Sequence, residues 1–411
     1  MHIDPDHDSL SYWHATQEPM IPVDDVPATA EVVVVGGGML GVWSTYWLAK
    51  AGVPVVLLEK SAIGWGATGR NGGFLTGGAA TGYPALIDLL GRETARQLFA
   101  LTMLGQELAH EVVHEEGIDC DLRRTGTLSL ALSASGLDGL QTHYELLRTD
   151  GFAGEMLDRQ ATQALINTPL AEEIAGAFLA PTGGLLHSSR YLAGLARAAQ
   201  AHGARIVRAE VTGIHTAGDH NLIATTAGSI EAERVIIALN AWTDTLVPET
   251  TNVIVPTRGQ ILAYEPREPI FTTATGADIT PTGEYWQQTP DGSIVIGGCR
   301  ADAPNKDSGV TDMTATPDVI AKIEGVLPRL FPNLSDLQVA RRWAGLMAFT
   351  PDYLPVVDAA QSSVSTWYGG GFCGHGMPFG PIIGRYLAQA AVDGTLSDDV
   401  GILSRSRPSL A

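Results

Sequence analysis

A glycine-rich turn between two buried strands constrains this fold more than any other feature of the sequence. Residues 32–35 are four consecutive valines, the pattern of a parallel strand that is buried on both faces. Residues 39–51 are then predicted to form a helix, and residues 53–58 a second buried strand that ends at Glu59. The turn after the first strand has the pattern G-x-G-x-x-G, with Gly36, Gly38 and Gly41. Together these segments predict one βαβ unit.

Each part of this unit suits the binding of a dinucleotide. Gly36 permits the tight turn, Gly38 lets the backbone approach a pyrophosphate, and Gly41 lets the helix pack closely on the strand. The N-terminus of the helix offers free N–H groups and the positive end of its dipole to the phosphates. Glu59 is placed to accept hydrogen bonds from a ribose hydroxyl. A glycine-rich turn in some other α/β fold is the alternative, which the matching strands, helix and acid disfavour.

Two further glycine-rich segments favour FAD over NAD. Residues 64–73 closely follow Glu59 and carry few side chains, so their backbone can run along a second, extended part of the ligand. Residues 369–376 lie near the other end of the chain and lead into a helix, where N–H groups can stabilise negative charge on a reduced flavin ring. A nicotinamide dehydrogenase is the weaker alternative, because it leaves this second segment unexplained.

The rest of the chain alternates between helical and strand patterns. Helices are predicted at residues 86–115, at 188–202 with Ser188 and Ser189 as the N-cap pair, and from about 381 to 392. Strands are predicted at residues 127–132, 205–214, 222–226, 235–239 and 366–371, with a hairpin over 284–298. The predicted fold class is α/β.

Composition restricts the partners. The chain has 411 residues, which suits two domains, and a formal net charge of -20. A field of that sign repels phosphate backbones, so nucleic acids and anionic membranes are poor partners. The three cysteines form no close Cys/His cluster, so neither a disulfide framework nor a metal site is predicted.

The ends and the apolar runs indicate a location. No signal-peptide pattern is visible at the start, and no apolar run approaches the roughly 18 residues of a membrane span. We therefore expect a soluble cytoplasmic protein without a membrane span. Residues 1–28 contain four prolines and many acids, and we expect them to form an arm that lies on the surface.

Segments spread over nearly the whole chain resemble one flavoprotein family. The matching segments are residues 11–13, 34–41, 66–73, 237–242, 256–260, 285–297, and 343–358 running on to 371–378. They resemble the D-amino-acid oxidase, glycine oxidase and sarcosine oxidase family, and best of all its γ-glutamylputrescine oxidase-like branch. The segments keep the family order, so the match is specific to the family but not to a substrate.

The resemblance implies a division into domains. A Rossmann-like FAD-binding domain would be built from the discontinuous stretches 29–85, 181–250 and 343–400. An α+β substrate-binding domain with an antiparallel sheet would comprise residues 86–180 and 251–342 and roof the flavin. The remaining parts are the N-terminal arm, residues 1–28, and a C-terminal tail, residues 401–411.

The resemblance also implies the residues that contact FAD. Glu59 and Lys60 would meet the adenosine ribose, and the backbone of Val211 would hold the adenine. The other residues expected at the cofactor are Gly36, Gly38, Met39, Leu40, Gly41, Ala67, Thr68, Arg70, Asn71, Gly72, Gly73, Asn240, Gly371, Phe372, Gly374, His375, Gly376 and Met377.

The chain departs from the family pattern where substrates and flavin are usually held. Met347 stands where amino-acid oxidases of the family carry a carboxylate-binding arginine, and Pro378 where sarcosine oxidases place a lysine. Both changes disfavour a simple α-amino acid and suit an amine. Val295 replaces the lysine that promotes reaction with oxygen, and Gly345 the cysteine that joins the flavin covalently. We therefore expect non-covalent FAD and leave the electron acceptor open.

Candidate catalytic and pocket residues each have a structural alternative. His375 is a catalytic candidate, but a hydrogen bond within the turn is its simpler role. Tyr285 faces the substrate cavity or packs in the roof. The expected substrate pocket contains Met347, Gln287 and Met377. Because side chains alternate along a strand, Trp286 and the pair Tyr285 and Gln287 must face opposite sides.

These observations favour oxidation of a carbon–nitrogen bond in a small amine or amino-acid-like substrate. Hydride would pass to flavin N5, the resulting imine would hydrolyse, and oxygen or another acceptor would reoxidise the flavin, with peroxide formed from oxygen. One alternative is an amino-acid oxidase or dehydrogenase with an unusual carboxylate anchor such as Arg70 or Arg300. An alternative of another class is a flavin-bearing binding protein with little turnover.

Overall fold

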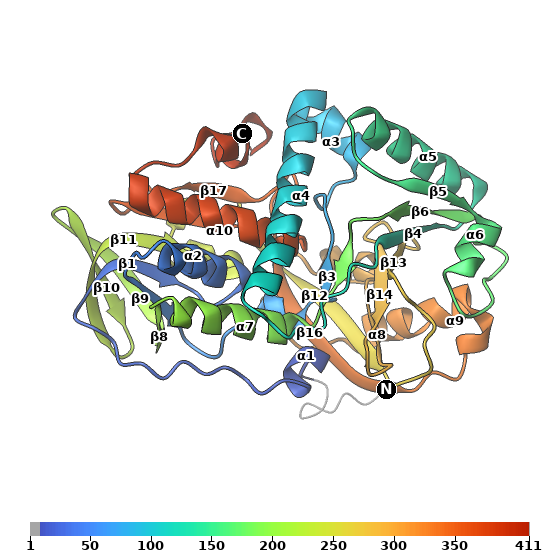
Figure 1. The fold of residues 1–411 in the computed structure, drawn as a ribbon, viewed down its shortest axis with the longest axis horizontal. Helices are drawn as coiled ribbons and strands as arrows, with labels where there is room; N and C mark the ends of the chain where they lie inside the picture. Colours follow the sequence, from blue (N-terminus) through green and yellow to red (C-terminus); the bar gives the residue numbers. More distant parts are fainter. Residues whose placement is uncertain (1–8, 411) are drawn as a thin grey trace.

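A computed structural model describes residues 9–410 and shows two lobes along its longest axis (Figure 1). Each lobe is built on an eight-stranded sheet. A further, two-stranded sheet pairs β3 (Phe74–Leu75) with β7 (Gly184–Leu185). The first eight residues of the expected arm and residue 411 of the expected tail lie outside the described part of the chain. The α/β class is confirmed.

The first sheet has a parallel centre. Its path is β17-β18-β11-β1-β2-β8, and β10 and β9 extend from β11. The strands are β1 (Thr29–Val35), β2 (Val55–Glu59), β8 (Arg205–Arg208), β9 (Val211–Ala217), β10 (His220–Thr225), β11 (Gly228–Ile237), β17 (Val356–Ala359) and β18 (Thr366–Gly370). β1 pairs in parallel with β2 and β11, with Val34 opposite both Leu57 and Ile236. The four valines are therefore buried between neighbours on both sides.

Three helices cover one face of this sheet. They are α2 (Met39–Lys50), α7 (Ser188–Ala201) and α10 (Gly376–Asp393), which lie in front of the sheet in Figure 1. Val32 and Val34 point toward these helices, whereas Val33 and Val35 join a separate apolar cluster on the opposite face. The alternation along β1 thus gives the sheet two buried faces.

The second sheet is mostly antiparallel. Its order is β16-β12-β15-β14-β13-β4-β6-β5, and only the β13–β4 pair is parallel. The strands are β4 (Thr127–Ala131), β5 (Glu155–Asp158), β6 (Gly176–Ala180), β12 (Val255–Tyr264), β13 (Ala274–Ala277), β14 (Glu284–Gln288), β15 (Ile294–Gly297) and β16 (Val339–Phe349). The helices of this lobe are α5 (Ala134–Thr149), α6 (Arg159–Ala164), α8 (Pro317–Glu324) and α9 (Val326–Leu330).

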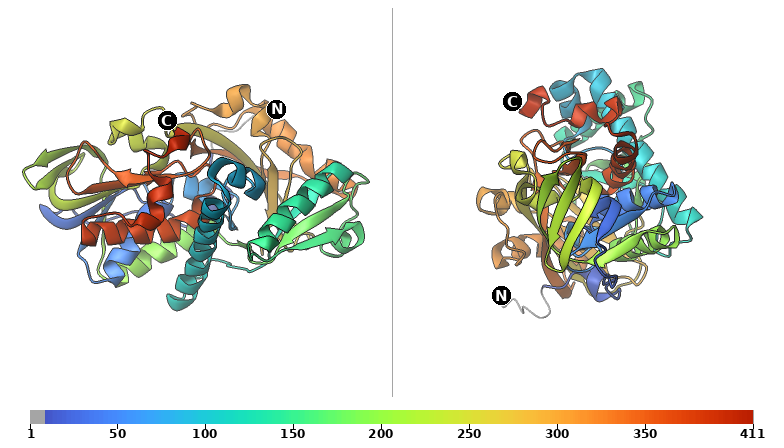
Figure 2. Two further views of the ribbon diagram at one scale, coloured as in Figure 1. Left: turned by 90° about the horizontal axis from the view of Figure 1, so that it is seen from above. Right: turned by 90° about the vertical axis from the view of Figure 1, so that its left-hand side faces the viewer.

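A long helix lies where the lobes meet. α4 (Arg92–Glu115) follows α3 (Tyr83–Leu90) and crosses beside α10, as the two orientations of Figure 2 also show. The approach is close, because a Cβ added to Gly105 would lie 1.9 Å from the carbonyl oxygen of Pro378. No described helix is long and apolar enough to cross a membrane.

Most predicted elements are present, and the differences have local causes. The helix predicted over 86–115 is two helices, because Gly91 has a φ of +76° and its N–H closes α3 on Ile87. The strand predicted over 205–214 is divided, because Ala209 donates to the carbonyl of Glu59 and the chain then leaves the sheet edge. β8 therefore pairs with β2, and β9 with β10.

Two helix starts differ from prediction. The cap of α7 is His187, whose Nδ1 accepts a hydrogen bond from the Arg190 N–H, so Ser188 and Ser189 lie inside the helix. α10 begins at Gly376, about five residues earlier than expected, and includes Pro381. Proline favours the first turn of a helix, which made the later start plausible from sequence.

The expected boundaries and the surface arm also need correction. β16 belongs to the second sheet, so the domain boundary expected at residue 343 falls inside a strand. The expectation that the N-terminal arm lies on the surface is wrong for its described helix α1 (Tyr12–Ala15), because Trp13 is fully buried against Val295 and Trp343. An apolar pair within a polar segment drives this insertion.

Candidate functional site

The turn after β1 requires glycine at both ends. Gly36 has a φ of +107°, and a Cβ there would lie 2.7 Å from the carbonyl oxygen of Ala238. A Cβ on Gly41 would lie 1.8 Å from the carbonyl oxygen of Gly36. Helix α2 therefore packs directly on the turn, and no larger residue fits at either position.

The N-terminus of α2 is suited to an anion. Its N-cap is Gly38, which contributes no side-chain cap, and a Cβ there would approach only Thr68 Oγ1, at 3.8 Å. The N–H of Met39 donates to Thr68 Oγ1 over 3.1 Å, and Leu40 follows in the same turn. The uncapped helix end next to a hydroxyl is the arrangement that binds a phosphate.

The acid at the end of β2 is held in place by backbone groups. Glu59 Oε2 accepts from the Gly37 N–H at 2.8 Å, and Oε1 accepts from the Ser61 N–H at 2.7 Å. Lys60 is exposed and lies 3.3 Å from Glu210, whose neighbour Val211 begins β9. The carboxylate thus lies beside the glycine turn, as a ribose-binding acid must.

Arg70 organises the loop that follows. The loop contains a 3-10 turn, Ala67–Arg70, and the buried guanidinium of Arg70 donates to the carbonyls of Trp65, Ser9 and Ala344. These bonds join the loop to the N-terminal segment and to β16. Arg70 is therefore committed to structure, which argues against it as a substrate carboxylate anchor.

The N-terminal helix α1 clamps the same loop. Ser11 Oγ donates to the Gly69 carbonyl, and Trp13 Nε1 donates to the Asn71 carbonyl, each at 2.6 Å. The sequence offered only a segment match here and no periodicity, so this role was not predicted. The clamp fixes the backbone on both sides of Arg70.

Two buried histidines in this region make stability depend on pH. Burial, aided by nearby arginines, lowers the pKa of His14 and His187 from 6.5 to about 4. Both are neutral in the fold, and the unfolded chain takes up protons first as pH falls. We expect the free energy of unfolding to decrease between pH 6.5 and about 4, by as much as about 3 kcal/mol for each histidine.

Urea unfolding at pH 7.5 and pH 5 measures this dependence. The double variant, His14→Gln with His187→Gln, should lose less stability over that pH interval than the unmodified protein, because glutamine does not titrate. Equal losses in both proteins would contradict the assignment.

The second glycine segment connects β18 to α10. Gly371 and Gly374 have φ values of +70° and +83°, and the Cys373 N–H donates to the Ala348 carbonyl over 2.8 Å. His375 is the N-cap of α10 without a side-chain cap bond, and Gly376 begins the helix. A second uncapped helix N-terminus therefore follows this turn, with Phe372 buried beneath it.

His375 lies within this turn. Its Nδ1 is 3.3 Å from the Cys373 carbonyl oxygen, and burial lowers the pKa of the imidazole. The ring is therefore neutral at physiological pH, and its hydrogen bond supports the turn.

Asn71 and Asn240 connect the glycine segments. Asn71 Oδ1 accepts from the Gly73 N–H, and its Nδ2 lies 3.5 Å from the sulfur of buried Met377. Asn240, with a φ of +47°, accepts through Oδ1 from the Gly371 N–H over 3.1 Å. The first glycine segment is thus in side-chain contact with the start of α10, about 300 residues away in the sequence.

The second sheet, called the roof below, presents Tyr285 and Gln287 to the first glycine segment. A Cβ on Gly72 would lie 2.7 Å from the Tyr285 ring, and Gln287 Nε2 donates to the Gly72 carbonyl at 2.5 Å. Trp286 faces the other way, where it packs on Phe331. The predicted alternation is confirmed, and the amide of Gln287 is already engaged with the loop.

Tyr285 and Met347 lie at different parts of this roof. The Tyr285 hydroxyl lies over Gly297, its ring contacts Phe74, and burial raises the pKa to about 12. Met347 lies between β12 and the second glycine turn, since a Cβ on Gly374 would be 3.3 Å from its sulfur. The phenol of Tyr285 therefore keeps its proton at neutral pH and can donate a hydrogen bond.

A turn after β16 is fixed by the C-terminal tail. Both carboxylate oxygens of buried Asp352 accept from Arg407, at 2.6 and 2.8 Å, and Arg407 also donates to the Leu354 carbonyl. Thr350, which begins this turn, lies 3.6 Å from the Cys373 thiol. The tail therefore supports the second glycine segment from behind.

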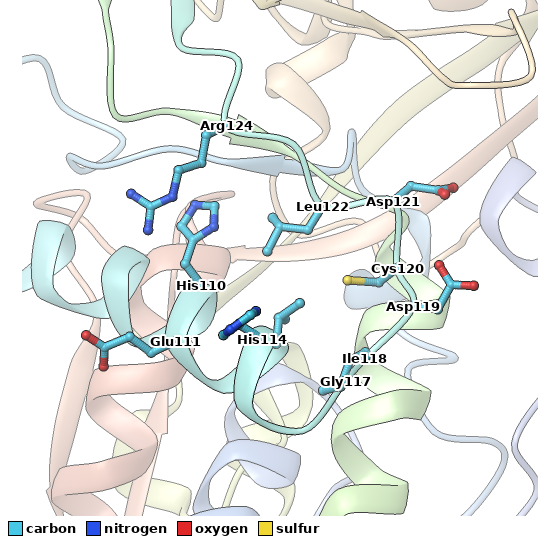
Figure 3. A pocket seen from close by; sticks show the side chains of 11 residues that line it. His110, Glu111, His114, Gly117, Ile118, Asp119, Cys120, Asp121, Leu122 and Arg124 are labelled. Atoms are coloured by element: carbon cyan, nitrogen blue, oxygen red, sulfur yellow. The ribbon is translucent and has the colours of Figure 1, made fainter.

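A separate cavity of about 720 Å³ lies beside α4 (Figure 3). His110 and His114 from α4 line it with residues of the following loop, including Cys120 and Arg124. None of the residues predicted for the flavin or the substrate lines it. Within residues 9–410, no group of three or more His, Cys, Asp or Glu side chains could hold a metal.

Comparison with known sequences gives a consistent result. Residues 31–390 match the family model described as DAO, FAD dependent oxidoreductase. The chain is 29% identical over 393 residues to γ-glutamylputrescine oxidoreductase of Escherichia coli (strain K12), covering 92% of this chain and 88% of that protein. It is 26% identical over 362 residues to glycine oxidase of Geobacillus kaustophilus (strain HTA426), covering 87% and 92%.

Solved structures show the same fold. Glycine oxidase from Geobacillus kaustophilus superposes with a TM-score of 0.78 at 23% identity, covering 93% of this chain and 99% of that chain. L-proline dehydrogenase from P. horikoshii superposes with a TM-score of 0.77 at 23% identity, covering 92% and 97%.

Proposed function

Because this chain belongs to the family of FAD-dependent oxidoreductases and uses FAD, we propose that it oxidises a carbon–nitrogen bond of a small amine or amino-acid-like substrate. The γ-glutamylputrescine oxidoreductase and glycine oxidases among its relatives support this reaction class. The observations that carry the proposal are the contact of Asn71 with Met377 after the second glycine segment and the packing of Tyr285 over Gly72 of the first. That arrangement gives a flavin ring a backbone bed and a roof.

The residues present fit FAD. The cradle at Gly38 has no side chain to obstruct a pyrophosphate, and the carboxylate of Glu59 lies next to it. The loop ending at Gly73 and the turn at Gly374 would hold the isoalloxazine, and the start of β9 at Val211 would meet the adenine. With glycine at position 345, no cysteine is available there for a covalent link.

When bound, FAD would supply the acceptor for a hydride from the carbon next to the nitrogen, which leaves an imine, and oxygen or another acceptor would then take the electrons. Water hydrolyses the imine. The protein orients the amine and excludes water, and the half-buried, protonated Tyr285 donates a hydrogen bond rather than removing a proton. Neutral His375 holds the turn. A neutral amine needs no strong base, so neither side chain has to act as one.

An anaerobic absorbance titration of the yellow holoenzyme with amines and amino acids, followed by air, tests the proposal. Bleaching by an amine with rapid recovery in air would establish an oxidase, and slow recovery a dehydrogenase. Full bleaching by dithionite but by no member of the panel would contradict the proposed reaction.

Tyr285→Phe tests the role of the phenol. We expect unchanged flavin content and a kcat/KM about tenfold lower, since one lost hydrogen bond corresponds to about 1–1.5 kcal/mol. Tyr386→Phe is the matched control, because Tyr386 lies on α10 and its hydroxyl donates to exposed Asp399 beyond the end of that helix. Equal activity of both variants would make Tyr285 a packing residue.

A further inference from the structure

Arg300 places a cation at the edge of the roof. It follows β15 as the first residue of a short 3-10 turn, Arg300–Asp302, and is half-buried. Its guanidinium carbon lies 4.5 Å from the centre of the Phe349 ring, and one nitrogen donates to the Lys306 carbonyl over 3.1 Å. A planar guanidinium stacked on an aromatic ring keeps its remaining N–H groups in a fixed direction.

No carboxylate among the described residues forms an ion pair with Arg300. The nearby acid Asp307 receives two hydrogen bonds from Arg258 and one from Gln260, so its oxygens are already engaged. Burial lowers the pKa of Arg300 because part of its hydration is lost, and the negative charge of nearby Asp307 only partly offsets that loss. A bound carboxylate would supply an anionic partner and the missing acceptors.

Arg300 lies close to the expected substrate side of the roof. It is three residues after Gly297, which lies opposite Tyr285 in the β14–β15 pair. Met347 and Phe349 are two residues apart on β16, so they project from the same face, about 7 Å apart. Apolar Met347 thus lies beside the second glycine turn, and Phe349 on the same face of β16 carries the cationic Arg300 over its ring.

The side of Phe349 that carries Arg300 lies close to solvent. Phe349 contacts Tyr353 at 5.6 Å between ring centres, and Tyr353 is 40% exposed. An anionic group on a ligand can therefore reach Arg300 from solvent, while the apolar part of that ligand contacts Met347.

We propose that Arg300 binds a carboxylate of the substrate, so that the substrate is an amino acid whose carboxylate is separated from the reacting carbon by several methylene groups. This inference rests on the proposed function and names its substrate class. The amine end lies over the glycine turns, the methylenes contact Met347, and the carboxylate receives a bidentate bond from the guanidinium stacked on Phe349.

Two matched series of probes test this subsite in the holoenzyme. One series is the ω-aminocarboxylates from glycine to 6-aminohexanoate, and the other is the n-alkylamines of the same lengths. Anaerobic flavin reduction gives an apparent Kd and a limiting rate for each compound. We expect the longer aminocarboxylates to bind roughly ten- to a hundredfold more tightly than the matching alkylamines, the size of a charge-assisted bond.

Arg300→Leu should remove that difference by raising Kd for the aminocarboxylates, with the limiting rate nearly unchanged. Arg300→Lys should restore part of it, because lysine keeps the charge but not the bidentate geometry. Arg148→Leu is the matched control, since Arg148 also lies over an aromatic ring, Tyr144 at 5.7 Å, but on exposed α5. Flavin content and circular dichroism confirm folding of each variant.

A second readout does not depend on turnover. Alkanoates from acetate to hexanoate are titrated against the flavin absorbance of the unmodified protein and of the Arg300 variants. Weaker alkanoate binding in Arg300→Leu, but not in Arg148→Leu, supports the subsite. Unchanged alkanoate binding in Arg300→Leu overturns it.

The failure of this inference differs from failure of the proposed function. If alkylamines and aminocarboxylates reduce the flavin equally well and Arg300→Leu changes neither, the subsite is overturned while amine oxidation stands. If α-amino acids are preferred and Arg300→Leu leaves them unaffected, the subsite is again overturned. If no compound reduces the flavin, the proposed function fails. The alkanoate titration then shows by itself whether Arg300 binds a carboxylate.

Discussion

Gly41→Ala should yield a protein that retains no FAD. The added methyl carbon would lie 1.8 Å from the carbonyl oxygen of Gly36, well inside contact distance, so α2 must move away from the turn. That displacement takes the uncapped helix end away from the phosphate position and separates α2 from the sheet. Absorbance near the flavin bands after gel filtration gives the flavin content, and we expect a loss above tenfold, together with a lower melting temperature.

Gly139→Ala is the control for this substitution. Gly139 lies in the middle of α5, and an added Cβ meets nothing within 4 Å. Alanine there should stabilise the protein by up to about 1 kcal/mol, because glycine is the poorer helix former. Normal flavin content in Gly41→Ala would contradict the close packing of α2 on the turn.

Trp13→Ala should unfold the clamp on the flavin loop. The indole is fully buried between Val295 and Trp343, and its N–H donates to the Asn71 carbonyl. Removing a large buried aromatic side chain costs about 3–5 kcal/mol, and here it also leaves the Asn71 carbonyl without its partner. We expect a loss of that size in urea unfolding and faster release of FAD on dilution.

Val23→Ala provides the comparison within the same N-terminal segment. Val23 is 84% exposed, so its truncation should change stability by less than about 0.5 kcal/mol. If Trp13→Ala released FAD no faster than Val23→Ala, the N-terminal segment would be a passive covering rather than a clamp.

The βαβ unit was predictable because its signals are local. Four consecutive valines, the G-x-G-x-x-G turn and Glu59 all lie within about thirty residues, and each has one physical role. The hairpin of β14 and β15 and the opposite orientation of Trp286 followed equally from alternation along a strand. Such patterns need no knowledge of distant contacts.

The clamp and the roof edge were not predictable in the same way. α1 has four residues and no periodicity, and Trp13 meets its partner 58 residues away. Arg300 was only one of two alternative anchors in the sequence, and Arg70 was the other. Their different surroundings, three backbone carbonyls for Arg70 and the Phe349 ring for Arg300, depend on long-range packing.

The interleaved path of the first sheet dictates an order of assembly during synthesis. β18 lies beside β11, and α10 packs on α2, so the chain must be made past residue 370 before the sheet that begins at residue 29 is complete, and past residue 390 before α10 covers it. Until α10 is in place, Val32 and Val34 of β1 lack part of the helical layer that buries them. A partly made chain therefore exposes apolar strand surface, which favours aggregation.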